Sequence, residues 1–145
     1  MYDNPQHVED TFTENNLSEY LLQAQWAEFI ELKKAIMEIY RKKKSPLTIL
    51  DIGIGNARIL KHLIGIEEIW NMIEHYEGID IAKNCMYLSN EIIKDLKISR
   101  KANVQLLDAI NLKKLNKKYD LIISTWFTVG NFYPFDFDFK NFKHG

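Results

Sequence analysis

The feature that most constrains this chain is a short apolar run that leads directly into two closely spaced glycines. Residues 47–52, LTILDI, are apolar enough for a strand that is buried on both faces. Gly53 and Gly55 follow at once, and a helical pattern begins at Asn56. Glycine permits a sharp turn and lets a ligand approach the backbone closely. A strand, a glycine turn and a helix in this order indicate an α/β unit with a binding site at the turn.

Strands and helices continue to alternate along the chain. We expect helices at about 17–43, 56–64, 67–75 and 82–97, and strands at 47–52, 76–80, 103–107 and 119–125. Strands that alternate with helices and are apolar on both faces predict a parallel sheet with right-handed crossovers. The expected fold class is therefore α/β, with a Rossmann-like parallel sheet and flanking helices.

The chain divides into four predicted parts. These are a polar N-terminal arm at 1–16, an amphipathic helix at 17–44, a Rossmann-like domain at 45–133 and an aromatic-rich tail at 134–145. In the helix, apolar residues recur at spacings of three or four, which predicts one inward-facing stripe. The stripe comprises Leu22, Trp26, Phe29, Ile30, Ile36, Met37 and Tyr40.

Composition excludes several classes of protein. A length of 145 residues suits one domain, and a formal net charge of −1 argues against a protein that binds nucleic acid by broad electrostatics. The single cysteine, Cys85, excludes an intramolecular disulfide and suits a reducing compartment. The four histidines lack metal-ligand spacing, so we expect no metal site. Neither a signal peptide nor a membrane-spanning run is found, which predicts a soluble, cytoplasmic protein.

Three acids come at the ends of three consecutive predicted strands. They are Asp51, Asp80 and Asp108. Any one of them could be a helix cap or a turn residue. In an open α/β sheet, however, ligands bind at the carboxyl ends of the strands, where all three acids would lie. Their coincidence predicts a ligand site at this edge.

Two kinds of cofactor compete for the glycine turn. An NAD site requires the pattern G-x-G-x-x-G, and here Arg58 occupies the third glycine position. Asp51 would also repel a pyrophosphate. S-adenosylmethionine carries a sulfonium and an ammonium group but no phosphate, so an acid at this strand end favours it.

At these residues the chain resembles the class I S-adenosylmethionine-dependent methyltransferases. The four similar segments are 51–58 (DIGIGNAR), 78–81 (GIDI), 107–109 (LDA) and 119–124 (YDLIIS), in the order that the family has them. The resemblance covers about residues 47–133. Ala57 stands where the family usually has a third glycine.

The resemblance implies S-adenosylmethionine as the cofactor and S-adenosylhomocysteine (SAH) as its product. It implies cofactor-binding roles for Gly53, Gly55 and Asn56 in the glycine turn, Asp51 at the ammonium group, Asp80 at the ribose, Ile81, Asp108 and Ala109 at the adenine, and Ser124 and Thr125 beside the sulfonium. The catalytic residues stay unknown. Residues 124–127, STWF, lack the Asn/Asp-Pro-Pro-aromatic sequence common in enzymes that methylate the amino groups of bases. A small-molecule or peptide acceptor is therefore expected.

The family fold has seven strands in the order 3-2-1-4-5-7-6, and only four are expected here, in the order 3-2-1-4. Residues 126–142 hold 8 of the 18 aromatic residues. One interpretation is a fragment whose tail packs against missing strands. Another is a tail that folds back on the fourth strand, or an exposed sheet edge that pairs with a second copy or a partner chain. The hypotheses are thus a methyltransferase or its cofactor-binding part, a non-catalytic cofactor-binding module that needs a partner chain, and a nucleotide oxidoreductase fragment.

Overall fold

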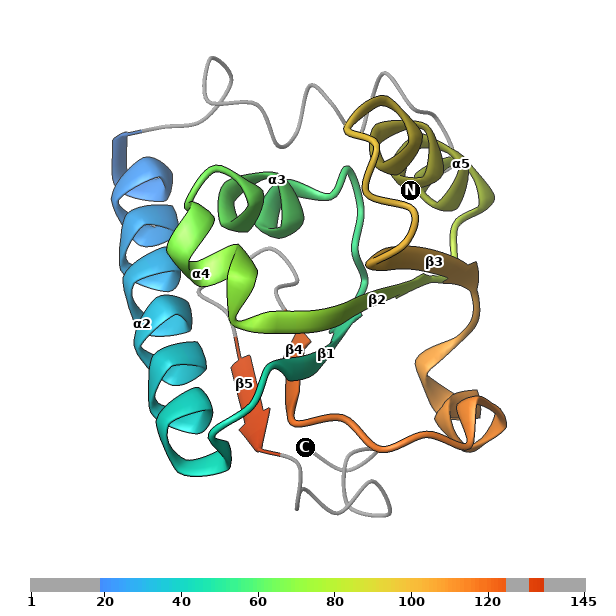
Figure 1. The fold of residues 1–145 in the computed structure, drawn as a ribbon. Coiled ribbons are helices and arrows are strands. Elements are labelled where there is room, and N and C mark those ends of the chain that lie inside the picture. Colours follow the sequence, from blue (N-terminus) through green and yellow to red (C-terminus); the bar gives the residue numbers. More distant parts are fainter. Residues whose placement is uncertain (1–18, 125–130, 135–145) are drawn as a thin grey trace.

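The computed structural model describes residues 19–124 and 131–134 of the chain. Its elements form one mixed sheet with helices around it (Figure 1). In chain order they are α2 (Glu19–Lys43), β1 (Leu47–Ile52), α3 (Arg58–Ile64), α4 (Glu67–Asn71), β2 (Ile73–Asp80), α5 (Lys83–Asp95), β3 (Ala102–Leu106), a 3₁₀ helix (Ala109–Leu115), β4 (Leu121–Ser124) and β5 (Asn131–Pro134).

The sheet has the strand order β3-β2-β1-β4-β5. The first four strands are parallel, so the α/β fold class and the predicted order 3-2-1-4 are confirmed. Ile52 at the end of β1 lies beside Ile79 of β2 and Ser124 of β4, which brings the carboxyl ends of these strands to one edge.

The sheet has a fifth strand beyond the four predicted. β5 pairs with β4 in the antiparallel direction, which agrees with the interpretation in which the aromatic-rich segment at 126–142 folds back on the fourth strand. The segment NFYP has only four residues and ends in proline, which is tolerated only at sheet edges, so its pattern is too short to indicate a strand. The alternating residues 135–139 lie outside the described part of the chain.

The helix predicted at 67–75 is too long. α4 ends at Asn71, and β2 begins at Ile73 rather than at residue 76. Ile73 is buried and lies beside Leu47 of β1, so pairing between strands extends β2 toward its amino end. The domain boundary predicted at residue 45 stays a prediction.

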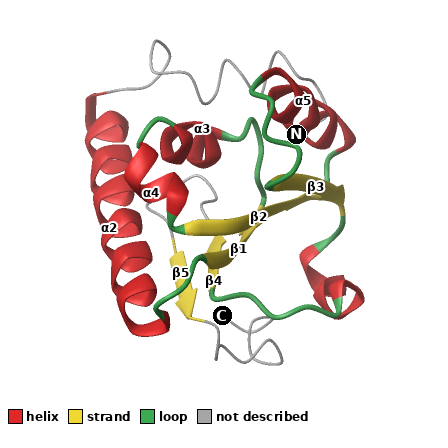
Figure 2. Cartoon of the chain, viewed as in Figure 1, coloured by secondary structure: helices red, strands yellow, loops and turns green. Residues whose placement is uncertain are grey.

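Two apolar clusters lie on opposite faces of the sheet. Helices α2 to α5 cover one face, and the 3₁₀ helix covers part of the other (Figure 2). The larger cluster, under the helices, includes Leu32, Ile36, Leu60, Leu63 and Tyr76. The smaller cluster is made by Leu50, Ile52, Ile79, Tyr119 and Ile122, with Leu112 and Leu115 of the 3₁₀ helix packed against it.

The predicted inward stripe of α2 is only partly right. Phe29 and Ile36 are buried, but Trp26, Ile30 and Met37 are exposed. Leu32, which the predicted stripe omitted, is fully buried. At 100° per residue the exposed group lies about a quarter-turn from the buried one. The sequence therefore contains two neighbouring apolar stripes, and its periodicity does not say which of them faces the sheet.

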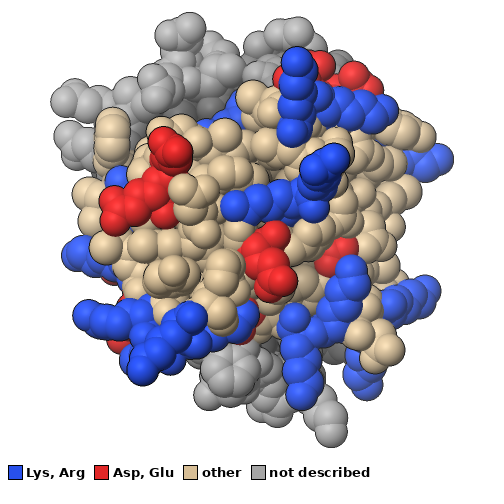
Figure 3. All heavy atoms as spheres, viewed as in Figure 1, with Lys and Arg blue, Asp and Glu red and all other residues tan. Residues whose placement is uncertain are grey.

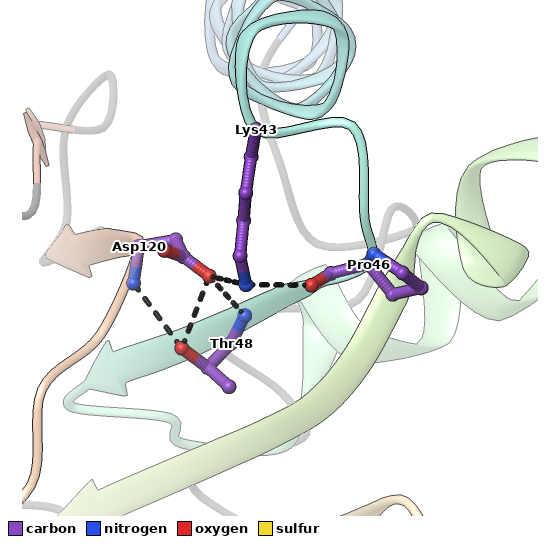
Figure 4. Close-up of polar contacts among 4 residues, drawn as sticks. All are labelled: Lys43, Pro46, Thr48 and Asp120. Carbon is purple, nitrogen blue, oxygen red and sulfur yellow. Dashed lines mark hydrogen bonds and ion pairs between the residues drawn. The ribbon is translucent and has the colours of Figure 1, made fainter.

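The C-terminal end of α2 is fastened to the amino ends of β1 and β4 (Figure 4). Lys43 Nζ donates to Asp120 Oδ2 at 2.7 Å and to Pro46 O at 2.8 Å. The same Asp120 oxygen accepts from Thr48 N at 2.9 Å. We call these four residues the amino-edge clasp. The clasp fixes the end of α2 to the sheet.

The surface seen in Figure 3 carries separate groups of basic side chains with acidic side chains between them. In the basic run at 41–44 the side chains are exposed, and Lys43 is the member held in the clasp. Among the described residues no helix is long and apolar enough to cross a membrane.

Candidate cofactor site at the carboxyl edge of the sheet

The glycine turn between β1 and α3, residues 53–57, has three residues in the left-handed region of backbone space. Gly53 has φ 75° and Gly55 has φ 60°, values that glycine adopts at little cost. Ala57, in the position of the family's third glycine, has φ 61° and ψ 32°. This conformation costs a residue with a Cβ about 1–2 kcal/mol, so a glycine would adopt it more easily than this alanine does.

The turn packs tightly on β2. The backbone N–H groups of Gly53 and Ile54 both donate to Ile79 O, at 2.9 and 3.1 Å. The side chain of Ile54 lies directly over Gly78, where a Cβ would be 2.4 Å from Ile54 Cδ1 and 3.0 Å from Ile54 Cβ. Gly78 is therefore required by the close approach of the turn to the strand.

Asp80, at the end of β2, holds the glycine turn by a hydrogen bond to its backbone. Its Oδ2 accepts from Gly55 N at 2.9 Å, and its Oδ1 accepts from Ala82 N at 2.9 Å. The residue is only 8% exposed. A carboxylate has about four lone-pair sites, so two remain for other donors such as ribose hydroxyls. Asp80 thus shapes the turn as well as ending the strand.

A serine that no sequence motif indicated also fixes this turn. Ser89 lies in α5, is fully buried and donates from Oγ to Gly55 O at 2.6 Å. The N–H of Gly55 is bonded to Asp80 and its carbonyl to Ser89, so both polar groups of this glycine are held. The only available signal was a polar residue on the inward face of a predicted helix.

Asp51 is the most deeply buried acid of the site. It is 1% exposed, and its Oδ2 accepts a hydrogen bond from the Tyr76 hydroxyl at 2.5 Å. Its Oδ1 is buried and has no hydrogen-bond partner among the described residues. Burial raises the pKa of Asp51 to about 7, against the lowering effects of the Tyr76 bond and of the Arg58 charge. A buried acceptor without a donor is costly, so this oxygen fits a cationic ligand group.

The residues predicted to face an adenine lie beyond β2 and β3. Ile81 is 66% exposed, so its apolar side chain is accessible at this edge of the sheet. Asp108 follows β3, and its Oδ1 caps the 3₁₀ helix by accepting from Ile110 N at 3.1 Å. This cap, an alternative considered from the sequence, uses one of the two carboxylate oxygens. Ala109 packs against the smaller apolar cluster.

The remaining predicted residues differ in what the structure says of them. Asn56 is buried within the glycine turn. Ser124 ends β4, beside Ile52 of β1, and is partly exposed. Thr125 lies outside the described residues. Within the described part of the chain, no three His, Cys, Asp or Glu side chains are grouped as metal ligands would be.

Comparisons with known proteins give matches among solved structures. No family model and no curated protein matches the sequence. The structure is similar to protein arginine methyltransferase 10 of Arabidopsis thaliana, with a TM-score of 0.58, 17% identity and coverage of 86% of this chain and 30% of that chain. It is also similar to magnesium protoporphyrin IX methyltransferase (ChlM) of Synechocystis PCC 6803 with bound SAH, with a TM-score of 0.55, 12% identity and coverage of 82% and 51%.

A third similar structure is WbdD, with a TM-score of 0.54, 14% identity and coverage of 65% of this chain and 20% of that chain. The chain thus spans between about a fifth and a half of these structural neighbours. The identities are low, and what the neighbours share with this chain is the arrangement of strands and helices. Together with the strand order 3-2-1-4 and the glycine turn between β1 and α3, they show that this chain has the fold of the class I methyltransferases.

Proposed function

We propose that this chain binds S-adenosylmethionine at the carboxyl edge of its sheet and serves a methyl transfer to a small-molecule or peptide acceptor. One observation carries the proposal. Asp51 and Asp80 lie at the carboxyl ends of the adjacent parallel strands β1 and β2 beside the glycine turn, and Asp108 follows the next strand, β3. Asp51 also presents a buried oxygen with no hydrogen-bond partner among the described residues. A site made of acids suits a cationic, phosphate-free nucleotide better than a dinucleotide.

Each side chain has a task that its position allows. Asp51 would accept from the ammonium group, and Asp80 would use its remaining lone pairs for the ribose hydroxyls. Ile81 would cover one face of the adenine, which Asp108 and the Ala109 backbone would contact at its edge. Ser124 and Thr125 would lie beside the sulfonium.

When bound, the cofactor supplies an activated methyl group on a sulfonium. Such a transfer requires in-line placement of a nucleophile, so positioning by the protein supplies much of the catalysis. Asp80 and Ser89 hold the glycine turn through hydrogen bonds to Gly55, so the turn can fix the position of the cofactor.

A second candidate function is a non-catalytic cofactor-binding subunit that works with a partner chain. It is favoured by the edge position of β5, the outer side of which pairs with no other strand in the described part of the chain. A partner or second copy would meet the sheet edge beyond β5. Both functions share the same cofactor site, and we place both in the cytoplasm.

The first test is calorimetric titration of the folded chain with SAH, with NAD as the control ligand. We expect saturable one-to-one binding of SAH and none of NAD. Asp80→Asn removes the negative charge that we expect to accept from the ribose hydroxyls. A charge-assisted hydrogen bond of this kind is worth about 1.5–3 kcal/mol, so the variant should bind SAH about tenfold or more weakly. Thermal unfolding of the same variant shows whether the turn is still formed.

Asp95→Asn is the matched control, since Asp95 is exposed at the end of α5. It should bind SAH like the parent chain. Absence of SAH binding by a folded chain, or equal binding by Asp80→Asn and Asp95→Asn, would contradict the proposal. Methyl transfer by the chain alone would separate the enzyme from the non-catalytic subunit.

A further inference from the structure

The first residue of α3, Arg58, is held by the long N-terminal helix. Its Nη2 forms an ion pair with Glu28 Oε1 of α2 at 2.9 Å. The two side chains are 15% and 2% exposed, so this pair is largely shielded from solvent. The guanidinium carbon of Arg58 also lies 5.5 Å from the centre of the Phe29 ring, again on α2. A residue of the predicted glycine motif is thus oriented by two neighbouring residues of another helix.

The pair with Glu28 leaves part of the guanidinium unused. A guanidinium has five N–H donors in a flat fork, which suits a carboxylate that binds two of its nitrogens. Here the Glu28 contact involves Nη2, while Arg58 Nη1 is buried and has no hydrogen-bond partner among the described residues. Buried donors without acceptors are costly and rare in folded proteins.

The buried acceptor of Asp51 lies at the other end of the same turn. Asp51 is two residues before Gly53, and Arg58 follows Ala57, so the two side chains flank the glycine turn. The charge of Arg58 acts on Asp51, which places the two groups in one electrostatic neighbourhood. One side of the turn therefore offers an unused acceptor on an acid, and the other offers an unused donor on a base.

We propose that Asp51 and Arg58 together bind the α-amino acid end of the cofactor, Asp51 at its ammonium group and Arg58 at its carboxylate, with Glu28 as a positioning residue that holds Arg58 from α2. An α-amino acid group carries these two charges on one carbon, and it would satisfy both unused atoms at once. The inference rests on the proposed function and extends it, since it makes α2 part of the cofactor site.

The test compares two ligands that differ only at the α-amino acid end of the cofactor. SAH carries the amino acid group, whereas 5′-methylthioadenosine keeps the adenosine and the sulfur and lacks that group. Arg58→Gln should weaken SAH binding about tenfold or more, and leave methylthioadenosine binding within about twofold of the parent chain. Retained methylthioadenosine binding also shows that the variant is folded.

Three further variants sharpen the result. Glu28→Gln keeps the size of the side chain but removes its charge, so it should weaken SAH selectively and by less than Arg58→Gln. Arg58→Lys keeps the positive charge beside Glu28 but lacks the forked guanidinium, so its loss of SAH affinity should lie between those of the parent chain and Arg58→Gln. Arg100→Gln alters an exposed arginine and serves as the matched control.

The outcomes separate the two proposals. If SAH binds the parent chain and depends on Asp80, but Arg58→Gln weakens both ligands equally or neither, this inference is overturned and the cofactor site stands. If the folded parent chain binds neither ligand, both are overturned.

Discussion

The two ends of the parallel sheet place aspartates in opposite situations. At the amino end, one oxygen of Asp120 accepts from Lys43 and from the Thr48 backbone, both across short distances. At the carboxyl end, Asp51 is more deeply buried, and one of its oxygens has no hydrogen-bond partner among the described residues. The first acid is matched within the protein and fastens α2. The second is left unmatched where the topology of the sheet places ligands.

This difference teaches how to distinguish a structural acid from a functional one in such a sheet. Burial does not separate them, because Asp51 is buried and binds Tyr76 as a structural acid would. What separates Asp51 from Asp120 is a buried oxygen that no donor of the described residues reaches. A structural acid should therefore be needed for stability and not for binding, while a functional acid should show the reverse.

The largest expected effect comes from Gly78→Ala at the carboxyl end. The new Cβ would lie 2.4 Å from Ile54 Cδ1 and 3.0 Å from Ile54 Cβ, so the buried Ile54 side chain and the glycine turn that carries it must shift. We expect a loss of roughly 1–3 kcal/mol in the free energy of unfolding, together with loss of SAH binding. Thermal unfolding and calorimetry measure the two effects.

Gly65→Ala is the matched control for this change. Its Cβ would lie 3.4 Å from His62 O, an ordinary contact, and Gly65 has φ −66°, which alanine adopts freely. It should keep full binding and equal or slightly higher stability. If both glycine variants behave alike, close packing of the turn is not what the site needs.

The next effect is expected at the amino end. Asp120→Ala leaves the Thr48 N–H without its acceptor and Lys43 with Pro46 O alone, and should lower the free energy of unfolding by roughly 1–3 kcal/mol. SAH affinity, measured well below the unfolding temperature, should stay within about twofold of the parent chain. A variant that unfolds at the parent temperature but binds SAH poorly would reverse the roles given to the two ends.

Asp51→Asn, unlike Gly78→Ala and Asp120→Ala, is expected to raise the free energy of unfolding. Because burial raises the pKa of Asp51 from 3.8 to about 7, the folded chain holds a proton between these values that the unfolded chain has released. The stability that this group contributes is thus complete at low pH, falls as the pH rises from about 4 to about 7, and stays low above that.

The amide of the Asp51→Asn variant carries no such charge. This variant should therefore unfold at a higher temperature than the parent chain at pH values above about 7, with the difference shrinking toward about 4. The SAH affinity of the parent chain should rise over the same pH range, because the ammonium group of SAH binds an ionised carboxylate more tightly than a protonated one. Melting curves and SAH titrations across this pH range test the two statements; a variant less stable than the parent at high pH would contradict the first.

The smallest effect is expected for Ala57→Gly. Relief of the left-handed conformation should stabilise by about 1–2 kcal/mol. Loss of a buried methyl group should cost about 0.8 kcal/mol, and the greater freedom of glycine in the unfolded chain should cost about 0.5–1 kcal/mol. The net change should lie close to zero, with SAH binding retained. A marked gain in unfolding temperature would show that the alanine strains the turn more than its burial compensates.

Much of the fold was predictable because its strands are locally distinctive. The bounds of β1 agree with the predicted 47–52, and the strand order agrees with the one that the resemblance to the class I methyltransferases implies. What escaped prediction depends on contacts between distant segments. β2 begins early because it pairs with β1, and α2 turns Leu32 rather than Trp26 toward the core.

The site shows the same division. The glycines and the three acids could be located from the sequence because each lies at or just beyond the carboxyl end of a strand. Their supports could not, since Tyr76, Ser89 and Glu28 act across 25 to 34 positions or from another helix. Glu77 is a further example. It is fully buried in β2, and its partners are Tyr119, Asn103, Gln105 and Lys117.

The amino-edge clasp has a consequence for how the protein can be divided. Cutting the chain at the predicted boundary before residue 45 would separate Asp120 from Lys43 and Arg58 from Glu28, leaving one charge stranded at each end of the sheet. It would also bare the apolar surface that Leu32 and Ile36 cover. Residues 45–134 should therefore behave as an aggregation-prone remainder, and α2 should be treated as integral to the smallest autonomously folding unit.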